Sequence, residues 1–393
     1  MKVPEPYRLF FPLGVGFAVL AALVWPLHAA GLIPYPATIH WTLMIQGFLP
    51  CFIFGFLFTA LPAFLHADRI GPLETAFAAA GMAVFGILTL AGQPAAGQVA
   101  FLVPIAVAVQ AAVRRFPRRR GDPPEEFVFV ALGLLFGVAG GVLGAGAHAG
   151  WWDEPAPRYA LHLVSKGMAL SIVMGVGGLL VPTFSAMRDP LVIPGIARPG
   201  QRRPRRLLYV PLMLLLVVAA VLDGRGMDPI AAWLRVIFCS VLGGLVWKLY
   251  RPPGRPSLLS YSIWTAGWLI VAGVWLAALV PSRAILGFHL GFLGGYGVLI
   301  LGIATRVVVT HGGYPPVHER RVLRPLPVAA LAAALISRVL SDVWAVHAAP
   351  LHALSGALWI TAWAVWAWEA VPCMIRKGVG PLVIDTARFS RKP

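Results

Sequence analysis

Twelve apolar stretches, each long enough to cross a bilayer, divide this chain of 393 residues. A transmembrane helix needs about 20 mostly apolar residues. Hydrophobic residues make up 59% of the chain and charged residues 12%, a balance far from that of soluble proteins. We therefore predict an all-α integral membrane fold, with residues 1–393 forming a single polytopic domain. The predicted transmembrane helices are 10–30, 41–64, 73–92, 98–113, 127–148, 162–185, 207–222, 229–250, 258–280, 285–309, 324–345 and 350–375.

The net charge of +17 is distributed unevenly between the two sides of the predicted helices. Of the 32 Lys and Arg residues, 25 fall in segments on the side of the N-terminus and three in the opposite loops. Because cytoplasmic loops are enriched in Lys and Arg, this bias predicts that both termini lie in the cytoplasm. The runs RRFPRRR at 114–120 and RPGQRRPRR at 198–206 are then topology and lipid-surface signals. We expect the lipid bilayer, and no nucleic acid, as partner.

Histidines gather at one end of the predicted helices. Seven of the ten lie at the predicted outer side: His28, His40, His148, His162, His289, His347 and His352. Neutral imidazole is a common protein ligand for haem iron and copper. A set of imidazoles at one depth therefore indicates a haem or metal site near this side. For His28, His148 and His347 the alternative is an interfacial position, with the ring reaching water.

His40, His162 and His289 open the second, sixth and tenth predicted helices, with four helices from one to the next. Gly55 and Gly175 each stand seven residues before a proline in the first two of these helices. Similarity at a fixed period is typical of a duplicated unit, so the pattern favours a threefold pseudo-repeat of four helices. Chance similarity among glycine-rich helices is the alternative.

Cationic side chains inside the predicted helices form a second set of candidates. Lys166 stands four residues after His162, so the two share a helical face. Arg338 stands four residues before Asp342, which predicts an ion pair on one face. Charges within a transmembrane helix usually face the bundle interior. Lys166, Arg235 and Arg338 are therefore candidates to neutralise haem propionates, with snorkelling to the headgroups as the alternative for Arg235.

Several short motifs resemble those of the NnrS family, in the same order and over nearly the whole chain. They are YRLFFPLG at 7–14, H-x₆-GF at 40–48, GFLFTALPAF at 55–64, the HL at 162, VPTFSAM at 181–187 and ATRVVVTHGG at 304–313. The resemblance implies a haem protein of the bacterial inner membrane, with copper in some members, that acts in nitric oxide metabolism beside denitrification. His40, His162 and His289 match family histidines, and Arg306 and His311 match the TRV-x₃-H pattern.

One departure from the family pattern bears on the metal. The family usually has HxHE at the start of the second helix, whereas this chain has Thr42 and Leu43 at the second His and the Glu. This weakens the expectation of copper and of a proton-donating carboxylate there.

The residues and the resemblance together give a set of expected ligands. We expect His40 and His289 to bind the iron of a b-type haem, because both lie near the outer boundary and match family positions. His162, with His352, is the candidate for a second haem or for another metal such as copper. Lys166 and Arg338 are expected to hold the haem propionates, in a site open to the periplasm.

Three functions remain open. The first is an enzyme that reduces nitric oxide to N₂O at haem, with a quinol or an electron-carrier protein as donor. The second is a sensor or scavenger that binds nitric oxide through haem or copper without turnover. The third is a small-molecule transporter, a function that suits twelve helices. The sequence singles out no catalytic residue.

Overall fold

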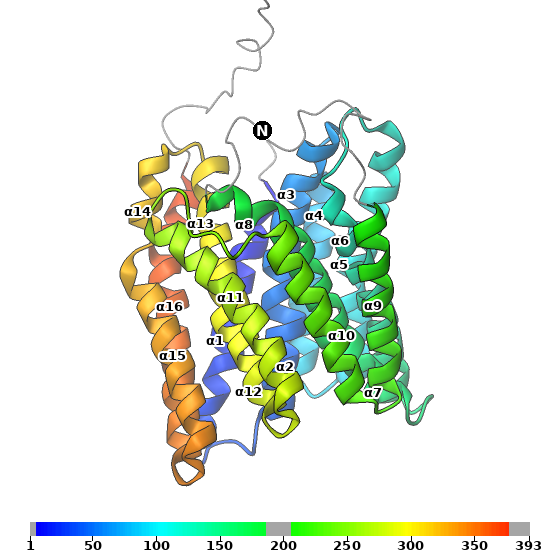
Figure 1. Ribbon diagram of the computed structural model, residues 1–393, viewed down its shortest axis with the longest axis vertical. Helices are drawn as coiled ribbons and strands as arrows, with labels where there is room; N and C mark the ends of the chain where they lie inside the picture. Colours follow the sequence, from blue (N-terminus) through cyan, green and yellow to red (C-terminus); the bar gives the residue numbers. More distant parts are fainter. Residues whose placement is uncertain (1–4, 186–205, 377–393) are drawn as a thin grey trace, which may run out of the picture.

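The computed structural model describes residues 5–185 and 206–376 of the chain. Within these ranges, twelve helices are long and apolar enough to cross a membrane, which confirms the predicted number. They are Tyr7–Ala29, Ala37–Leu65, Pro72–Leu90, Pro94–Arg118, Glu125–His148, Ala156–Phe184, Leu207–Gly224, Asp228–Val246, Leu258–Leu279, Pro281–His311, Pro325–Val343 and Ala345–Ile375. Figure 1 shows them packed side by side as one bundle.

The largest boundary difference is at the sixth span, predicted from residue 162, which begins at Ala156; two other spans begin earlier than predicted at a proline. The fourth helix, predicted from residue 98, begins at Pro94, the first residue of α5 (Pro94–Arg115). The tenth span, predicted from residue 285, begins at Pro281. Proline suits the first turn of a helix, where its missing N–H has no intrahelical partner to lose. The hydropathy of the sequence does not show this, so both spans are longer than predicted.

The three spans that carry His40, His162 and His289 share one construction. Each consists of a short α-helix that contains the histidine, a π-helical segment that begins within three residues of it, and a longer α-helix. The segments are α2 (Ala37–Thr42), η1 (Leu43–Phe48) and α3 (Leu49–Leu65); α7 (Ala156–His162), η4 (Leu163–Met168) and α8 (Ala169–Phe184); and α12 (Ala284–His289), η7 (Leu290–Gly297) and α13 (Val298–His311). This shared construction supports the predicted repeat.

These three spans also form the centre of the bundle. Their most apolar windows are 83%, 83% and 72% buried, against 61% or less for the other nine spans described. A fourth π segment, η5 (Leu242–Val246), follows α10 (Asp228–Val241) and carries no histidine. Since π segments are rare and often occur at functional sites, the three that follow a histidine direct attention to the bundle interior.

The remaining helices surround this centre. They are α1 (Tyr7–Ala29), α4 (Pro72–Leu90), α5, α6 (Val128–His148), α9 (Arg206–Gly224), α10, α11 (Leu258–Leu279), α15 (Pro325–Val343) and α16 (Ala348–Ile375). Helix α16 packs along both α1 and α15, which closes the bundle between its first and last spans. The short helix α14 (Glu319–Val322) lies between α13 and α15 in the chain. In Figure 1, α2, α7 and α12 lie at the end of the bundle away from the N-terminus. We name this end the cavity end and the other the basic end.

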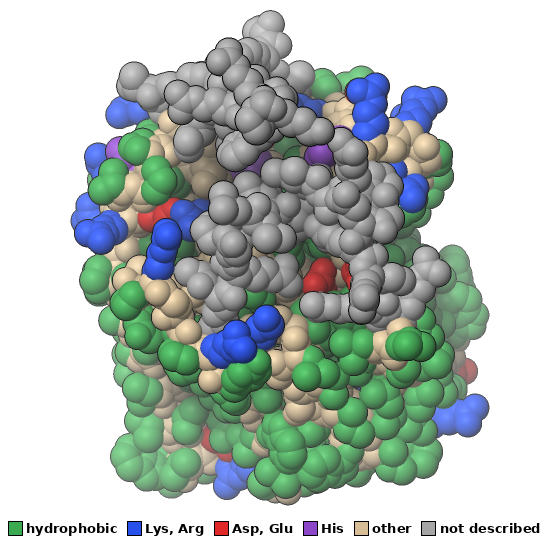
Figure 2. Space-filling model, turned by 45° about the horizontal axis from the view of Figure 1, so that its top comes forward, with side chains coloured by type: hydrophobic (Ala, Val, Ile, Leu, Met, Phe, Trp, Pro, Cys, Tyr) green, Lys and Arg blue, Asp and Glu red, His purple; other side chains and the backbone are tan. Residues whose placement is uncertain are grey.

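The described charges support the predicted asymmetry between the two ends. Loops at the basic end hold Arg69, Arg119 and Arg255, among others, whereas the described loops and helix starts at the cavity end hold three cations, Arg158, Arg225 and Arg283. Figure 2 shows Lys and Arg side chains around the basic end and hydrophobic side chains below it. The predicted basic segments at 188–205 and from 377 onward, and Lys2, lie outside the described residues. The cytoplasmic location of the termini stays a prediction.

Candidate haem and metal site

A cavity of about 460 Å³ lies in the cavity end of the bundle. Its walls come from α1, α15, α16 and the three histidine-bearing spans. All six residues predicted for the site line it: His40, His162, Lys166, His289, Arg338 and His352. The other walls are mainly aromatic and aliphatic, and no Asp or Glu is among the lining residues. The cavity thus combines imidazoles and cations in a largely apolar chamber.

The rings of His40 and His289 are held by backbone carbonyls. His40 Nδ1 lies 2.7 Å from the carbonyl oxygen of Ala21, and His289 Nδ1 lies 2.8 Å from that of Ile285. A carbonyl oxygen only accepts, so each Nδ1 carries the proton and donates it. Each Nε2 is then left with a free lone pair, which is how second-sphere hydrogen bonds prepare a histidine for a metal.

His352 lies near His40 and His289, in an arrangement centred on Trp25. The Trp25 ring centroid is 4.7 Å from that of His352 and 5.4 Å from that of His40. The three imidazoles are near enough to interact electrostatically. We call His40, His289 and His352 the three-histidine cluster. His352 was predicted to pair with His162 and instead lies with His40 and His289, beside Trp25. Trp25 was not predicted, because the sequence marks it only by its place near a helix end.

Arg338 is a cation without a carboxylate partner among the described ion pairs. Its Nη1 donates to Ser341 Oγ at 2.9 Å. The predicted pair between Arg338 and Asp342 is wrong, because Arg283 binds Asp342 instead, at 2.5 Å from Oδ2. The charge of Arg338 acts on all three members of the three-histidine cluster. Asp342 attracts Arg338 without forming an ion pair with it, so the guanidinium remains able to bind an anionic group in the cavity.

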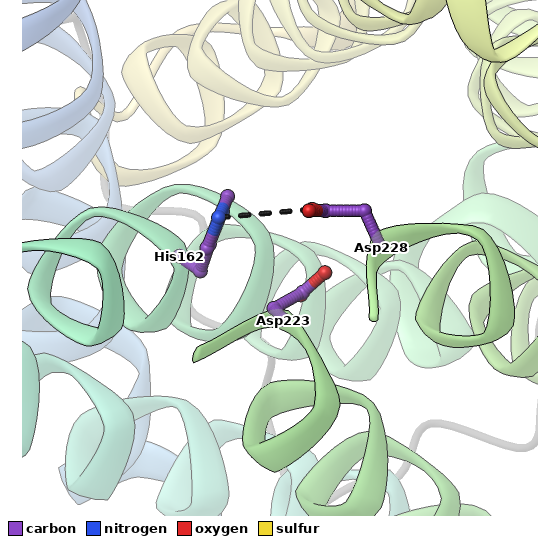
Figure 3. Close-up of side chains that lie close together, drawn as sticks. All are labelled: His162, Asp223 and Asp228. Atoms are coloured by element: carbon purple, nitrogen blue, oxygen red, sulfur yellow. Dashed lines mark ion pairs between the residues drawn. The ribbon is translucent and has the colours of Figure 1, made fainter. Parts of the chain in front are cut away.

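His162 and Lys166 belong to a separate group of charged side chains, which the sequence analysis missed in part. Asp223 ends α9 and Asp228 begins α10, so the short turn between these helices brings both carboxylates to His162 (Figure 3). His162 Nε2 lies 3.7 Å from Asp228 Oδ1. Lys166 Nζ lies 3.2 Å from Asp223 Oδ1 and 2.9 Å from Asp228 Oδ1. Arg235 Nη1 lies 2.5 Å from Asp223 Oδ2.

We call His162, Lys166, Asp223, Asp228 and Arg235 the ionic cluster. With His162 neutral, its formal charges cancel. Two carboxylates face two cations, and the Asp223 side chain is only 1% exposed. Ligand atoms of His162, Asp223 and Asp228 lie within 4.8 Å of one another, a spacing that suits a metal ion. The Lys166 ammonium, however, already lies between the two carboxylates. Arg235 is paired with Asp223 inside the bundle, so its side chain does not extend to the lipid headgroups. Propionate binding by Lys166 stays a prediction. The Lys166 ammonium would have to bind the propionate while already paired with Asp223 and Asp228.

The TRV-x₃-HGG motif lies at the basic end, away from the cavity. Arg306 forms an ion pair with Glu319, and Thr305 Oγ1 accepts a hydrogen bond of 2.9 Å from Trp366 Nε1. His311 Nδ1 lies 2.9 Å from a carboxylate oxygen of Glu5. Burial raises the pKa of Glu5, but the hydrogen bond and attraction to His311, together with the attraction of Arg69 and Arg8, outweigh this and hold the pKa below its usual value. The motif thus joins α13 to the N-terminal segment, α14 and α16.

The comparison with protein families identifies the chain. It belongs to the NnrS family, whose profile, described as "NnrS protein", matches residues 3–377. No curated protein matches the chain. The match covers nearly the whole chain and confirms the resemblance drawn from the motifs. Family membership connects this multi-pass membrane protein with nitric oxide metabolism.

Proposed function

We propose that this NnrS-family protein binds a b-type haem in the cavity and reduces nitric oxide to N₂O there, in the bacterial inner membrane. One observation carries the proposal: four histidines and two cations, of which Arg338 forms no ion pair among the described residues, line a mainly apolar cavity that has no acidic side chain in its walls. A haem brings two carboxylates, an iron that binds imidazole, and a flat apolar ring. The cavity lining offers a cation for the carboxylates, imidazoles for the iron and apolar walls for the ring.

The volume and the lining of the cavity support the proposed group. Its volume of about 460 Å³ lies within the usual range for small-molecule and cofactor sites. Trp25, Phe288, Phe292 and Trp359 provide flat faces along its walls. His40 and His289 present Nε2 lone pairs, since both Nδ1 atoms are bound to carbonyls. Arg338 is the cation that faces the propionates.

The proposed reaction joins two NO molecules with two electrons and two protons to give N₂O and water. When bound, haem supplies an iron that binds nitric oxide and carries electrons, which come from a quinol or an electron-carrier protein. The histidines hold the group in place, and the apolar walls exclude bulk water and so strengthen the charge interactions inside. Arg338 balances the negative charge of the propionates.

Protons have a short route from the cavity end. The Asp228 side chain is 48% exposed, and its Oδ1 lies 3.7 Å from Nε2 of His162, which lines the cavity. One bridging water spans such a distance. His162 Nδ1 is buried without a hydrogen-bond partner. We therefore assign His162 the transfer of protons between Asp228 and the cavity.

A second candidate is a protein that binds nitric oxide without turnover, as a sensor or scavenger, through haem or copper. Imidazoles suit copper, but within the described residues the ligand atoms of His40, His289 and His352 do not all lie within 4.8 Å of one another, so a copper ion shared by the three requires their side chains to move. Lack of both haem and copper in the purified protein favours the third function, transport.

Nitric oxide consumption tests the proposed reaction. The detergent-purified protein, reduced with a quinol under anaerobic conditions, is expected to convert two NO into one N₂O through many cycles. A single stoichiometric uptake of NO without N₂O supports the sensor or scavenger and contradicts the enzyme.

The substitution Arg338→Gln is expected to weaken haem binding by about tenfold or more. Charge-assisted hydrogen bonds contribute about 1.5–3 kcal/mol, and 1.4 kcal/mol is about tenfold in affinity. The haem midpoint potential should also fall, because a nearby cation stabilises the reduced, more negative form. Haem content and redox titration measure both effects.

Arg320→Gln is the matched control, because Arg320 is exposed at the basic end. This variant should change neither the haem content nor the haem midpoint potential. Equal behaviour of the two variants contradicts the assigned role of Arg338.

A further inference from the structure

A second, smaller cavity of about 40 Å³ adjoins the main one. It lies between α10, α11 and the span formed by α12 and η7, and we call it the side pocket. Its apolar lining consists mainly of small side chains: Ala232, Gly273, Val274, Ala277, Gly287 and Gly291.

Three glycines shape the side pocket. A Cβ added to Gly273 would lie 2.5 Å from the carbonyl oxygen of Gly287, and one added to Gly287 would lie 2.6 Å from that of Gly273. These two glycines therefore let α11 and α12 approach closely. Gly291 is also buried, yet a Cβ there would meet no atom within 4 Å. The backbone of Gly291 also takes part in this close approach, since a Cβ on Gly273 would lie 2.8 Å from Gly291 N, yet space is left open where a Gly291 side chain would begin.

Of the four polar side chains that line the side pocket, Ser165, Lys166 and Arg235 are already partnered, and the Tyr296 hydroxyl is the one group without a hydrogen bond among the described residues. Lys166 and Arg235 are bound to carboxylates of the ionic cluster. Ser165 Oγ donates to the carbonyl oxygen of Leu161 at 2.6 Å. A buried water usually makes about three hydrogen bonds, whereas apolar cavities stay dry and take up apolar ligands such as xenon. A volume of about 40 Å³ is enough for a diatomic molecule and far too small for a quinol or a haem.

The side pocket is separated from the main cavity by shared side chains. Ser165, Lys166, Phe288, Phe292 and Tyr296 line both cavities. The three aromatic rings follow one another along a single helical face, with centroids 6.3 Å and 4.5 Å apart. A ligand in the side pocket is therefore one aromatic ring away from the chamber that holds the three-histidine cluster.

We propose that the side pocket is a binding site for a small uncharged gas molecule, next to the cavity in which that gas reacts. Its identity as nitric oxide rests on the proposed function, whereas its size and apolar character rest on the geometry alone. The site raises the local concentration of the gas beside the main cavity. Phe288, Phe292 and Tyr296 form the barrier that the gas crosses.

Gly291→Val tests the proposal, because the new side chain enters the open space. Gly244→Val is the matched control: Gly244 lies in η5, also has no atom within 4 Å of an added Cβ, and lines neither cavity. The first measurement uses xenon as the probe, in crystals of the full protein under xenon pressure. Xenon should occupy the side pocket of the wild type and of Gly244→Val, and its occupancy should be lost in Gly291→Val.

The second measurement is carbon monoxide rebinding after flash photolysis of the reduced protein. Gly291→Val should slow rebinding several-fold with an unchanged haem spectrum, and Gly244→Val should match the wild type. Ordered water in place of xenon, or xenon bound equally in all three proteins, overturns the proposal. If xenon binds in the side pocket but the protein contains no haem, the side pocket is supported and the proposed function is contradicted. If haem is present but xenon does not bind, only the side-pocket proposal fails.

Discussion

Replacing His40 or His289 with alanine is expected to reduce the haem content of the purified protein to less than about a tenth of the wild type's. Loss of one partner beyond the ligand sphere already lowers metal affinity by about 10- to 100-fold, and loss of a ligand itself should do at least as much. Both rings are held by backbone carbonyls at 2.7 and 2.8 Å, so each imidazole is already in a fixed orientation that alanine cannot reproduce. Haem per protein and the absorption spectrum measure the effect.

His148→Ala is the control for these two variants. His148 is exposed at the same end of the bundle and does not line the cavity. Gel filtration of each variant establishes that the bundle is intact. Added imidazole should restore part of the haem binding, since the alanine leaves space for it. Wild-type haem content and spectra in both His40→Ala and His289→Ala contradict the ligand assignment.

The substitution Asp223→Asn should lower the free energy of unfolding by about 3–5 kcal/mol, the usual cost of removing one partner of a buried ion pair. Asp223 is 1% exposed and is the carboxylate partner of Arg235 in the described structure. The variant leaves the Arg235 charge within a helix without an anion, and such charges are costly in a membrane. Denaturant unfolding in detergent, followed by the helical circular dichroism signal, measures the loss.

Asp153→Asn provides the comparison, because Asp153 is exposed in the loop after α6. A surface substitution of this kind usually changes stability by less than about 0.5 kcal/mol. The double variant Asp223→Leu with Arg235→Met removes both charges and should recover most of the loss. An Asp223→Asn protein as stable as Asp153→Asn is incompatible with a buried ionic cluster.

The sequence predicts the transmembrane helices well because length and hydropathy determine them locally. The residues His40, His162, Lys166, His289 and Arg338 could be placed at one depth by counting from the helix ends. That depth is why all of them line a single cavity. The rule that intramembrane charges face the interior was sufficient for Lys166 and Arg338.

Partners between distant segments could not be predicted in the same way. Lys166 and Asp223 are 57 positions apart, and no local pattern indicates their contact. The spacing of four favoured a pair between Arg338 and Asp342, but Arg283, in the turn before α12, binds Asp342 instead. The π segments were also missed, because hydropathy does not distinguish them from the α-helix around them.

The absorption spectrum of the detergent-purified wild type tests the central claim most directly. We expect a Soret band in the oxidised protein that shifts on reduction and shifts again when NO is added. The same spectrum from Arg320→Gln and its loss in His40→Ala would place the haem in the cavity. A protein with no Soret band after expression with ample haem, and with NO leaving the spectrum unchanged, contradicts the account.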